Sequence, residues 1–162
     1  MLLFYRIIVF LVLILSPIIL FGRIIKKKET LKSFFEKIGI YNKHKTRSKR
    51  KLIWIHGSSV GEILGVLPLI EKLDQSKYIG QILITSNTLS SSKIINNLNL
   101  KKTVHQFFPL DTNFLSKRFL NYWRPDIAIF VESEIWPNII LQIKEKKIPL
   151  ILLNARITKK SF

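Results

Sequence analysis

The sequence predicts an α/β protein, a doubly wound parallel sheet preceded by a hydrophobic helix. Five short apolar runs of strand length alternate with stretches of helical period. These runs are apolar at nearly every position, so we expect strands buried on both faces, as in parallel sheets. With 162 residues, 48% of them hydrophobic, the chain has room for one such domain and an appendage, but not for two domains.

Residues 1–22 are predicted to form a membrane anchor helix. The segment Leu2 to Phe21 is apolar except at three positions, and about 20 helical residues reach about 30 Å, the thickness of a hydrocarbon core. If Arg6 reaches the far interface the helix spans, and otherwise the 15 residues from Ile7 to Phe21 embed only part way. No small-residue cleavage site precedes the following basic residues, which disfavours a cleaved signal peptide.

Residues 23–50 are interpreted as a basic juxtamembrane segment. Residues 22–51 hold twelve Lys and Arg against two acids, a net +10 out of +17 for the chain. This concentration after an apolar helix indicates a cytoplasmic segment attracted to anionic lipid and argues against a nucleic-acid partner. The alternative is that the many basic residues reflect a lysine-rich composition and bind no partner. A short amphipathic helix is expected within 29–40.

The sheet domain is expected to occupy residues 51–162, with β and α elements in alternation. The predicted strands are Leu52 to His56, Gln81 to Ser86, Val104 to Phe107, Asp126 to Val131 and Pro149 to Asn154. The predicted helices are Glu62 to Leu73, Ser90 to Leu98, Asn113 to Tyr122 and Ile135 to Lys146. The absence of cysteine excludes disulfides, cysteine-based zinc sites and thiol catalysis, and the three histidines lack metal-ligand spacing.

The turn after the first strand, residues 56–62, is rich in small residues and leads into a helix. Here Ser58, Ser59 and Gly61 would let a polar ligand approach the backbone closely, although neither a dinucleotide fingerprint nor a phosphate loop is present. Glu62 fits two interpretations. With Ser59 it forms a capping-box pattern, which spacing alone favours, and as a functional carboxylate it would be kept ionised by the helix dipole.

Two acids, Glu132 and Glu134, follow the fourth strand, where open α/β sheets bind ligands. In continuing strand geometry they would face the same side, so one pKa would rise unless the pair is solvated or ion-paired. Trp136 and Pro137 come next, a pair that more often starts a helix than stacks on a sugar.

Other strand ends add further candidates for substrate binding. Thr88 follows the second strand, Asp111 the third, and Asn154 with Arg156 the fifth. Arg156 is a candidate phosphate-binding arginine, with a surface ion pair as the equal alternative.

In order and spacing, four motifs resemble the N-terminal domain of the 3-deoxy-D-manno-octulosonic acid (Kdo) transferases. They are residues 56–62, 108–111, 132–138 and 154–156. The resemblance implies the Rossmann-like N-terminal half of a GT-B glycosyltransferase. It also implies transfer of Kdo, with inversion, from CMP-Kdo to the lipid A precursor lipid IVA, on the cytoplasmic face of the inner membrane.

By position, Glu62 matches the family's proton acceptor, Glu132 the residue that supports the transition state, and Glu134 its neighbour. The resemblance implies neither a cofactor nor a metal. Residues 88–91, Thr-Leu-Ser-Ser, stand where the family usually has Thr-Pro-Thr-Gly, which puts the local turn in doubt. Because the family binds CMP-Kdo on a second domain, we expect this chain, ending at Phe162, to be a truncated acceptor-side half that is inactive alone. The alternative is a membrane-anchored module that binds anionic saccharolipid without catalysis.

Overall fold

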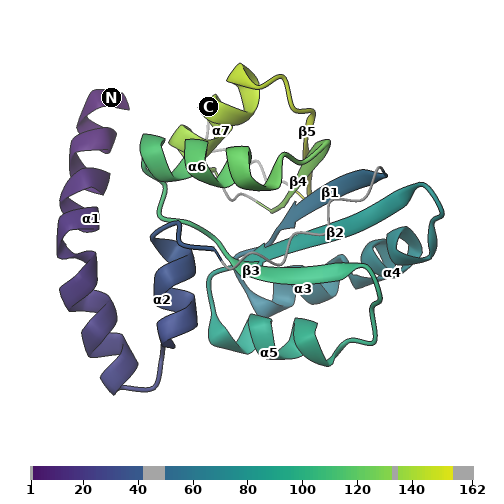
Figure 1. The fold of residues 1–162 in the computed structure, drawn as a ribbon, viewed down its shortest axis with the longest axis horizontal. Helices are drawn as coiled ribbons and strands as arrows, with labels where there is room; N and C mark the ends of the chain where they lie inside the picture. The colour runs from purple at the N-terminus through teal and green to yellow at the C-terminus, as the bar shows by residue number, and fades with distance from the viewer. Residues whose placement is uncertain (1, 42–49, 133–134, 155–162) are drawn as a thin grey trace.

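A computed structural model describes residues 2–41, 50–132 and 135–154 of the protein. Five strands form one parallel sheet in the order β3-β2-β1-β4-β5 (Figure 1), which confirms the predicted fold class. The strands are β1 (Lys51–His56), β2 (Ile79–Ser86), β3 (Thr103–Phe107), β4 (Ile127–Val131) and β5 (Leu150–Leu153). The helices are α1 (Leu2–Ile25), α2 (Leu31–Lys37), α3 (Val60–Gly65), α4 (Leu67–Gln75), α5 (Leu89–Asn97), α6 (Asn113–Trp123) and α7 (Pro137–Glu145).

Helices cover both faces of the sheet, with α3, α4 and α5 on one side and α6 and α7 on the other (Figure 1). Alternate residues of β1 enter two separate cores: Trp54 packs with Phe119 and Phe130, whereas Ile53 and Ile55 pack against the opposite helices. Trp54 and Ile55 are both fully buried. Both faces of the sheet are buried, as the sequence predicted, and the strands are apolar at nearly every position because each face packs against helices.

The expected helix at residues 62–73 is two helices, which corrects the prediction. Helix α3 ends at Gly65 and α4 begins at Leu67, with Pro68 in its first turn. Proline has no N–H to donate and its ring clashes with the preceding turn, so it starts a new helix and cannot continue the old one. The expected helix within 29–40 is the shorter α2, because Thr30 caps its start.

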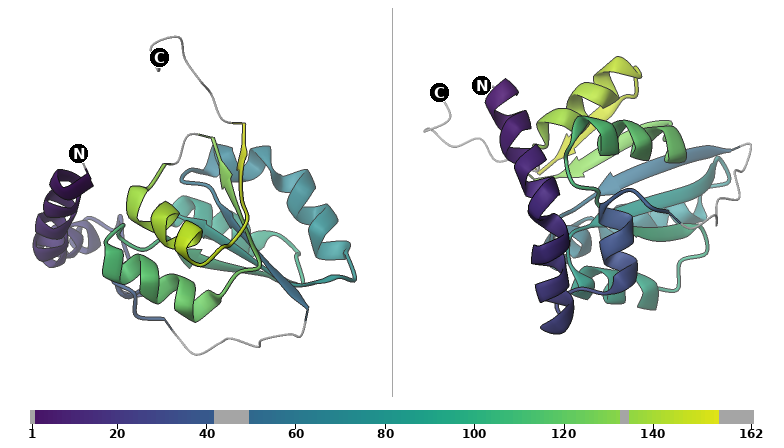
Figure 2. Two further views of the ribbon diagram at one scale, coloured as in Figure 1. Left: turned by 90° about the horizontal axis from the view of Figure 1, so that it is seen from above. Right: turned by 60° about the vertical axis from the view of Figure 1, so that its left-hand side comes forward.

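Helix α1 is the one helix in the described parts of the chain that is long and apolar enough to cross a membrane, judged by length and composition alone. It lies outside the sheet domain, which we define as β1 to β5 with α3 to α7, and runs beside α2 (Figures 1 and 2). Most of its apolar side chains are exposed in the structure. Such a surface is typical of contact with lipid or with another protein.

Candidate functional site

The carboxyl ends of all five strands meet at one edge of the sheet, which places the predicted site loops together. His56, the last residue of β1, pairs with Thr85 of β2 on one side and with Phe130 of β4 on the other. From β1 the chain passes to β2 and then β3, and it returns on the opposite side as β4 and β5. This reversal between β1 and β4 is a topological switch point, where open α/β sheets form their ligand crevice. The loops after β1 and β4, which carry Glu62 and Glu132, flank it.

The loop after β1 holds the Glu62 carboxylate by contacts within the loop itself. Ser58 N–H donates to Glu62 Oε2 at 2.8 Å, and the Ser59 hydroxyl donates to Oε1 at 2.7 Å. Glu62 N–H in turn donates to Ser59 Oγ at 3.3 Å, so the helix-capping interpretation is present in the structure. Each carboxylate oxygen keeps a second lone pair, because an ionised carboxylate has about four acceptor sites. Glu62 is half-buried, so the acceptor sites that the capping contacts leave unused can be reached from solvent.

Two glycines shape this loop for different reasons. A Cβ on Gly57 would lie 2.7 Å from Ile63 Cδ1 and 3.3 Å from Glu62 Cβ, so Gly57 is needed for close packing of α3 on the loop. A Cβ on Gly61 would meet only Ser59 Oγ, at 4.0 Å. Gly61 is exposed, and its missing side chain leaves open space beside Glu62.

The loop after β4 departs from the geometry that its sequence suggested. Glu132 has φ of +61°, in the left-handed region, while its N–H donates to Leu153 O at 2.6 Å. The prediction that Glu132 and Glu134 face the same side assumed a continuing strand, whereas β4 ends at Val131, and the relative orientation of the two acids stays a prediction. Lys27, Arg124, Lys147 and Asn154 are also left-handed, so the conformation marks Glu132 only together with its place after β4. Glu134 lies outside the described residues.

Asp111 is a structural cap for a distant helix. It is buried, and its carboxylate accepts four hydrogen bonds from the chain: Asn138 N–H and Ile139 N–H at 2.9 and 2.8 Å, Ser116 Oγ at 3.1 Å and the Tyr5 hydroxyl at 2.7 Å. Helix α7 has no side-chain cap of its own, so Asp111 satisfies the free N–H groups of its first turn. In this arrangement Asp111 positions the helix after the Glu132 loop. Direct contact with substrate stays a prediction.

The remaining predicted residues are spread along the same edge. Thr88 is the N-cap of α5, with its hydroxyl accepting from Ser91 N–H. The half-buried Trp136 precedes α7, with its ring 5.7 Å from that of Phe108. Asn154 is exposed beyond β5 in a left-handed conformation. Arg156 lies outside the described residues, so its role stays a prediction.

A hollow of about 300 Å³ lies at this edge and includes residues that the sequence analysis missed. Asp111 and Trp136 line it together with Arg23, Lys37 and Asn87, whereas neither Glu62 nor Glu132 is among its described lining residues. Asn87 joins the hollow to the first loop, because its side-chain amide donates to Ser58 Oγ at 2.8 Å. No motif pointed to Arg23 or Lys37, because they lie in segments far from the strand ends in the sequence, whereas Asn87 adjoins the predicted Thr88.

Lys37, in the basic segment, is bonded within the protein. Its Nζ lies 2.5 Å from the buried Glu29 carboxylate, and it donates to Asn87 O at 3.2 Å. Lys37 is itself buried, which leaves it satisfied by the protein. Lys26, Lys27 and Lys28, by contrast, are exposed. Only part of the predicted charge surplus is therefore free to meet anionic lipid.

Burial shifts two titratable groups beside the edge. Desolvation, helped by the charge of Lys32, lowers the pKa of His105 to about 4, and Ser86 Oγ lies 2.8 Å from its Nε2. Desolvation raises the pKa of Glu36, although Phe107 N–H donates to its carboxylate. His105 is therefore neutral near pH 7. Within residues 2–41, 50–132 and 135–154, no three His, Asp or Glu side chains gather as metal ligands.

Comparison with known proteins gives consistent matches. The family model of the 3-deoxy-D-manno-octulosonic-acid transferases (kdotransferases) matches residues 32–162. A 3-deoxy-D-manno-octulosonic acid transferase of Rickettsia bellii is 39% identical over 98% of this chain and 37% of its own length. A probable mitochondrial 3-deoxy-D-manno-octulosonic acid transferase of Arabidopsis thaliana is 41% identical over 72% of the chain and 26% of its length. One from Haemophilus influenzae is 35% identical over 67% of the chain and 26% of its length. The chain thus spans well under half the length of these relatives.

Proposed function

The chain belongs to the Kdo transferase family, and we propose that it is the acceptor-side domain of an inverting glycosyltransferase that moves Kdo from CMP-Kdo to a lipid A precursor, lipid IVA. The observation that carries the proposal is the position of two glutamate loops on either side of the β1–β4 switch point. The donor CMP-Kdo would be held by a second domain facing this edge. The reaction needs no metal or other cofactor in this proposal.

In the proposed reaction, Glu62 accepts the proton of the attacking lipid hydroxyl. The hydroxyl oxygen forms the new glycosidic bond to the anomeric carbon of Kdo, while the bond to the phosphate of CMP breaks on the opposite face. CMP leaves as a phosphate monoester and takes the bonding electrons, so the leaving group needs little acid assistance. The contacts from Ser58 and Ser59 fix the direction of the Glu62 carboxylate, which is the requirement for a positioned base.

Glu132 is proposed to support charge that develops in the transition state, and Glu134 to bind substrate beside it. Positive charge develops on the sugar ring as the bond to phosphate lengthens, and a fixed carboxylate stabilises it. The left-handed backbone at Glu132 supports this role, because strain persists where a side chain must be aimed. Ser58, Gly61, Thr88, Trp136, Asn154 and Arg156 would contact the acceptor along the same edge.

The proposed location is the cytoplasmic face of the inner membrane. One apolar helix, α1, together with the exposed Lys26, Lys27 and Lys28, supports association with an anionic membrane. A lipid acceptor requires such a position, since its sugar must reach Glu62 while its acyl chains stay in hydrocarbon.

Glu62→Gln tests the proposal directly. The chain is combined with the C-terminal domain of a related Kdo transferase, and Kdo transfer from CMP-Kdo to lipid IVA is measured. We expect the variant to lose about 10²-fold or more of the rate, because glutamine keeps the shape but cannot take the proton. Glu71→Gln, an exposed glutamate on α4, is the matched control and should keep full activity. Retention of lipid binding with no transfer from the combined wild-type domains would favour a saccharolipid-binding module.

A further inference from the structure

Both ends of α1 are fastened to the rest of the protein by polar contacts. At the N-terminal end, the Tyr5 hydroxyl donates to Asp111 Oδ2 at 2.7 Å and Arg6 Nε donates to Asn138 Oδ1 at 3.1 Å. At the C-terminal end, Arg23 Nε lies 3.4 Å from Glu29 Oε1. The first two partners belong to the α6 and α7 side of the sheet domain, whereas Glu29 lies six residues after Arg23, just before the Thr30 cap of α2. The N-terminal end of α1 is thus held against the sheet domain, and its C-terminal end leads into α2.

This docking is incompatible with a helix that crosses a bilayer. The 24 residues of α1 reach about 36 Å at 1.5 Å per residue, slightly more than the hydrocarbon core. A crossing helix has its two ends on opposite sides of the membrane. The C-terminal end of α1 leads into α2, which is bonded to the sheet domain through Glu36 and Lys37, so in a crossing helix Tyr5 at the other end could not reach Asp111.

We propose that α1 lies in the plane of the membrane surface, held to the sheet domain at its N-terminal end and leading into α2 at the other, with its outer face in the lipid. The inference rests on the membrane association in the proposed function and adds its geometry. It replaces the spanning anchor by an interfacial one, for which the partner is a bilayer with anionic headgroups. The Arg6 side chain then bonds Asn138 and has no far interface to reach.

The outer face of α1 has the composition that this placement needs. Large apolar side chains are exposed along its whole length, and those that line neither hollow beside α1 include Leu3, Phe4, Ile8, Ile14, Leu15 and Ile19. Lys26, Lys27 and Lys28 follow at once and are exposed, so cations lie at the level of the headgroups. Burying this apolar face in lipid removes it from water, which is favourable.

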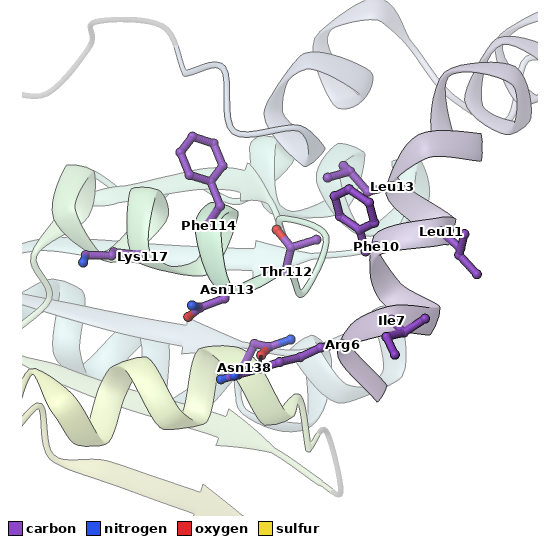
Figure 3. A pocket seen from close by; sticks show the side chains of 10 residues that line it. All are labelled: Arg6, Ile7, Phe10, Leu11, Leu13, Thr112, Asn113, Phe114, Lys117 and Asn138. Carbon is purple, nitrogen blue, oxygen red and sulfur yellow. Dashed lines mark hydrogen bonds between the residues drawn. The ribbon is translucent and has the colours of Figure 1, made fainter. Parts of the chain in front are cut away.

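The contact between α1 and the sheet domain is loose in a way that lipid explains. A hollow of about 750 Å³ separates α1 from α6, walled by Ile7, Phe10, Leu11, Leu13 and Phe114 (Figure 3). Arg6 and Lys117 also line it. A second apolar hollow of about 460 Å³ lies between α1 and α2. The second hollow is lined by apolar side chains alone, so hydrocarbon chains suit it better than water does, whereas the larger hollow also presents Thr112, Asn113 and Asn138.

The absence of cysteine from the sequence makes a topology test clean. One variant carries a single cysteine in a short polar tag ahead of Met1, and a second carries Lys101→Cys at the opposite, amino edge of the sheet. A membrane-impermeant maleimide is applied to spheroplasts and to inverted membrane vesicles from bacteria that express the full chain. We expect both thiols to react in inverted vesicles and neither in spheroplasts.

A tag that reacts in spheroplasts while Lys101→Cys reacts only in inverted vesicles would overturn the in-plane placement. Recovery of the chain in the soluble fraction would overturn membrane association itself. Neither result depends on Kdo transfer, so failure of the catalytic proposal is seen separately in the Glu62→Gln assay.

Cross-linking supplies a second, positional test in the same membranes. Ile7→Cys is paired with Asn113→Cys across the larger hollow, and Ile18→Cys with Asn113→Cys is the control, 11 residues or about 16 Å farther along the helix. A short bismaleimide should join the first pair in several-fold higher yield than the second. Equal, low yields would show that α1 is not docked and would defeat the proposal.

Discussion

The two sides of the switch point build their loops by different means. On the β1 side, Ser59 and Thr88 each cap the helix that follows them, accepting from an N–H three residues ahead. On the β4 side, Glu132 is left-handed and α7 takes its cap from Asp111, 27 residues earlier. A loop held by its neighbours in sequence is self-contained. A loop held by a distant carboxylate depends on the whole fold, so damage far from Glu132 should reach it.

The largest expected effect comes from removing the distant cap. Asp111→Ala should lower the free energy of unfolding by about 3 to 5 kcal/mol, because three buried donors and the part-buried Tyr5 hydroxyl lose their carboxylate acceptor. Urea denaturation measures it. Asp74→Ala, which removes a half-buried carboxylate that accepts Lys101 and Lys102 N–H, should cost about 1 kcal/mol. If Asp111→Ala and Asp74→Ala lose the same free energy of unfolding, the β4 side does not depend on Asp111 in the way we infer.

His105 tests the β1 side through pH. Its pKa is about 4 in the folded protein against 6.5 for an ordinary histidine, so unfolding takes up a proton between these values. Stability is therefore complete above pH 6.5 and falls as the pH drops towards 4, by up to about 3 kcal/mol. Urea denaturation of wild type and His105→Gln at pH 7 and pH 4.5 isolates this contribution. The raised pKa of Glu36 acts in the opposite direction, but it is common to both proteins. If the free energy of unfolding changes equally between pH 7 and pH 4.5 in wild type and in His105→Gln, the lowered pKa of His105 is contradicted.

Two glycines of the β1 loop offer a matched pair. Gly57→Ala places a methyl group 2.7 Å from Ile63 Cδ1 and should cost about 1 to 3 kcal/mol, as overpacking does. Gly61→Ala meets open space within α3 and should gain about 0.5 to 1 kcal/mol. Thermal unfolding compares them. If Gly61 is there for close approach of the acceptor, its variant should lose transfer activity while gaining stability.

The smallest expected effect relieves strain at Glu132. Glu132→Gly should raise the free energy of unfolding by about 1 kcal/mol, because glycine adopts the left-handed region freely, yet it should reduce Kdo transfer in the combined-domain assay. Asn154→Gly should gain less, since asparagine tolerates this conformation. A Glu132→Gly protein that is both stabilised and fully active would remove Glu132 from the proposed mechanism.

Local patterns in the sequence determined the alternation of elements, the parallel sheet and the edge at which the candidate residues gather. Apolar runs such as Ile127–Val131 predict strands that are buried on both faces of the sheet. The spacing of Ser59 and Glu62 indicates the start of a helix. Even the split between α3 and α4 was visible in Pro68, although the prediction passed over it. These features depend on residues within a few positions of one another.

Only the tertiary structure decided how distant segments share one site. No residue near Asp111 in the sequence indicates that its carboxylate caps α7 and accepts from the Tyr5 hydroxyl. No residue near Lys37 indicates its ion pair with Glu29 or its hydrogen bond to Asn87 O. The same holds for α1, whose composition fits a spanning helix, whereas only the structure shows Tyr5 and Arg6 bonded to the sheet domain. The physical reason is that a hydrogen bond between remote residues leaves no period or spacing in the chain, whereas burial of a strand or the capping of a helix does.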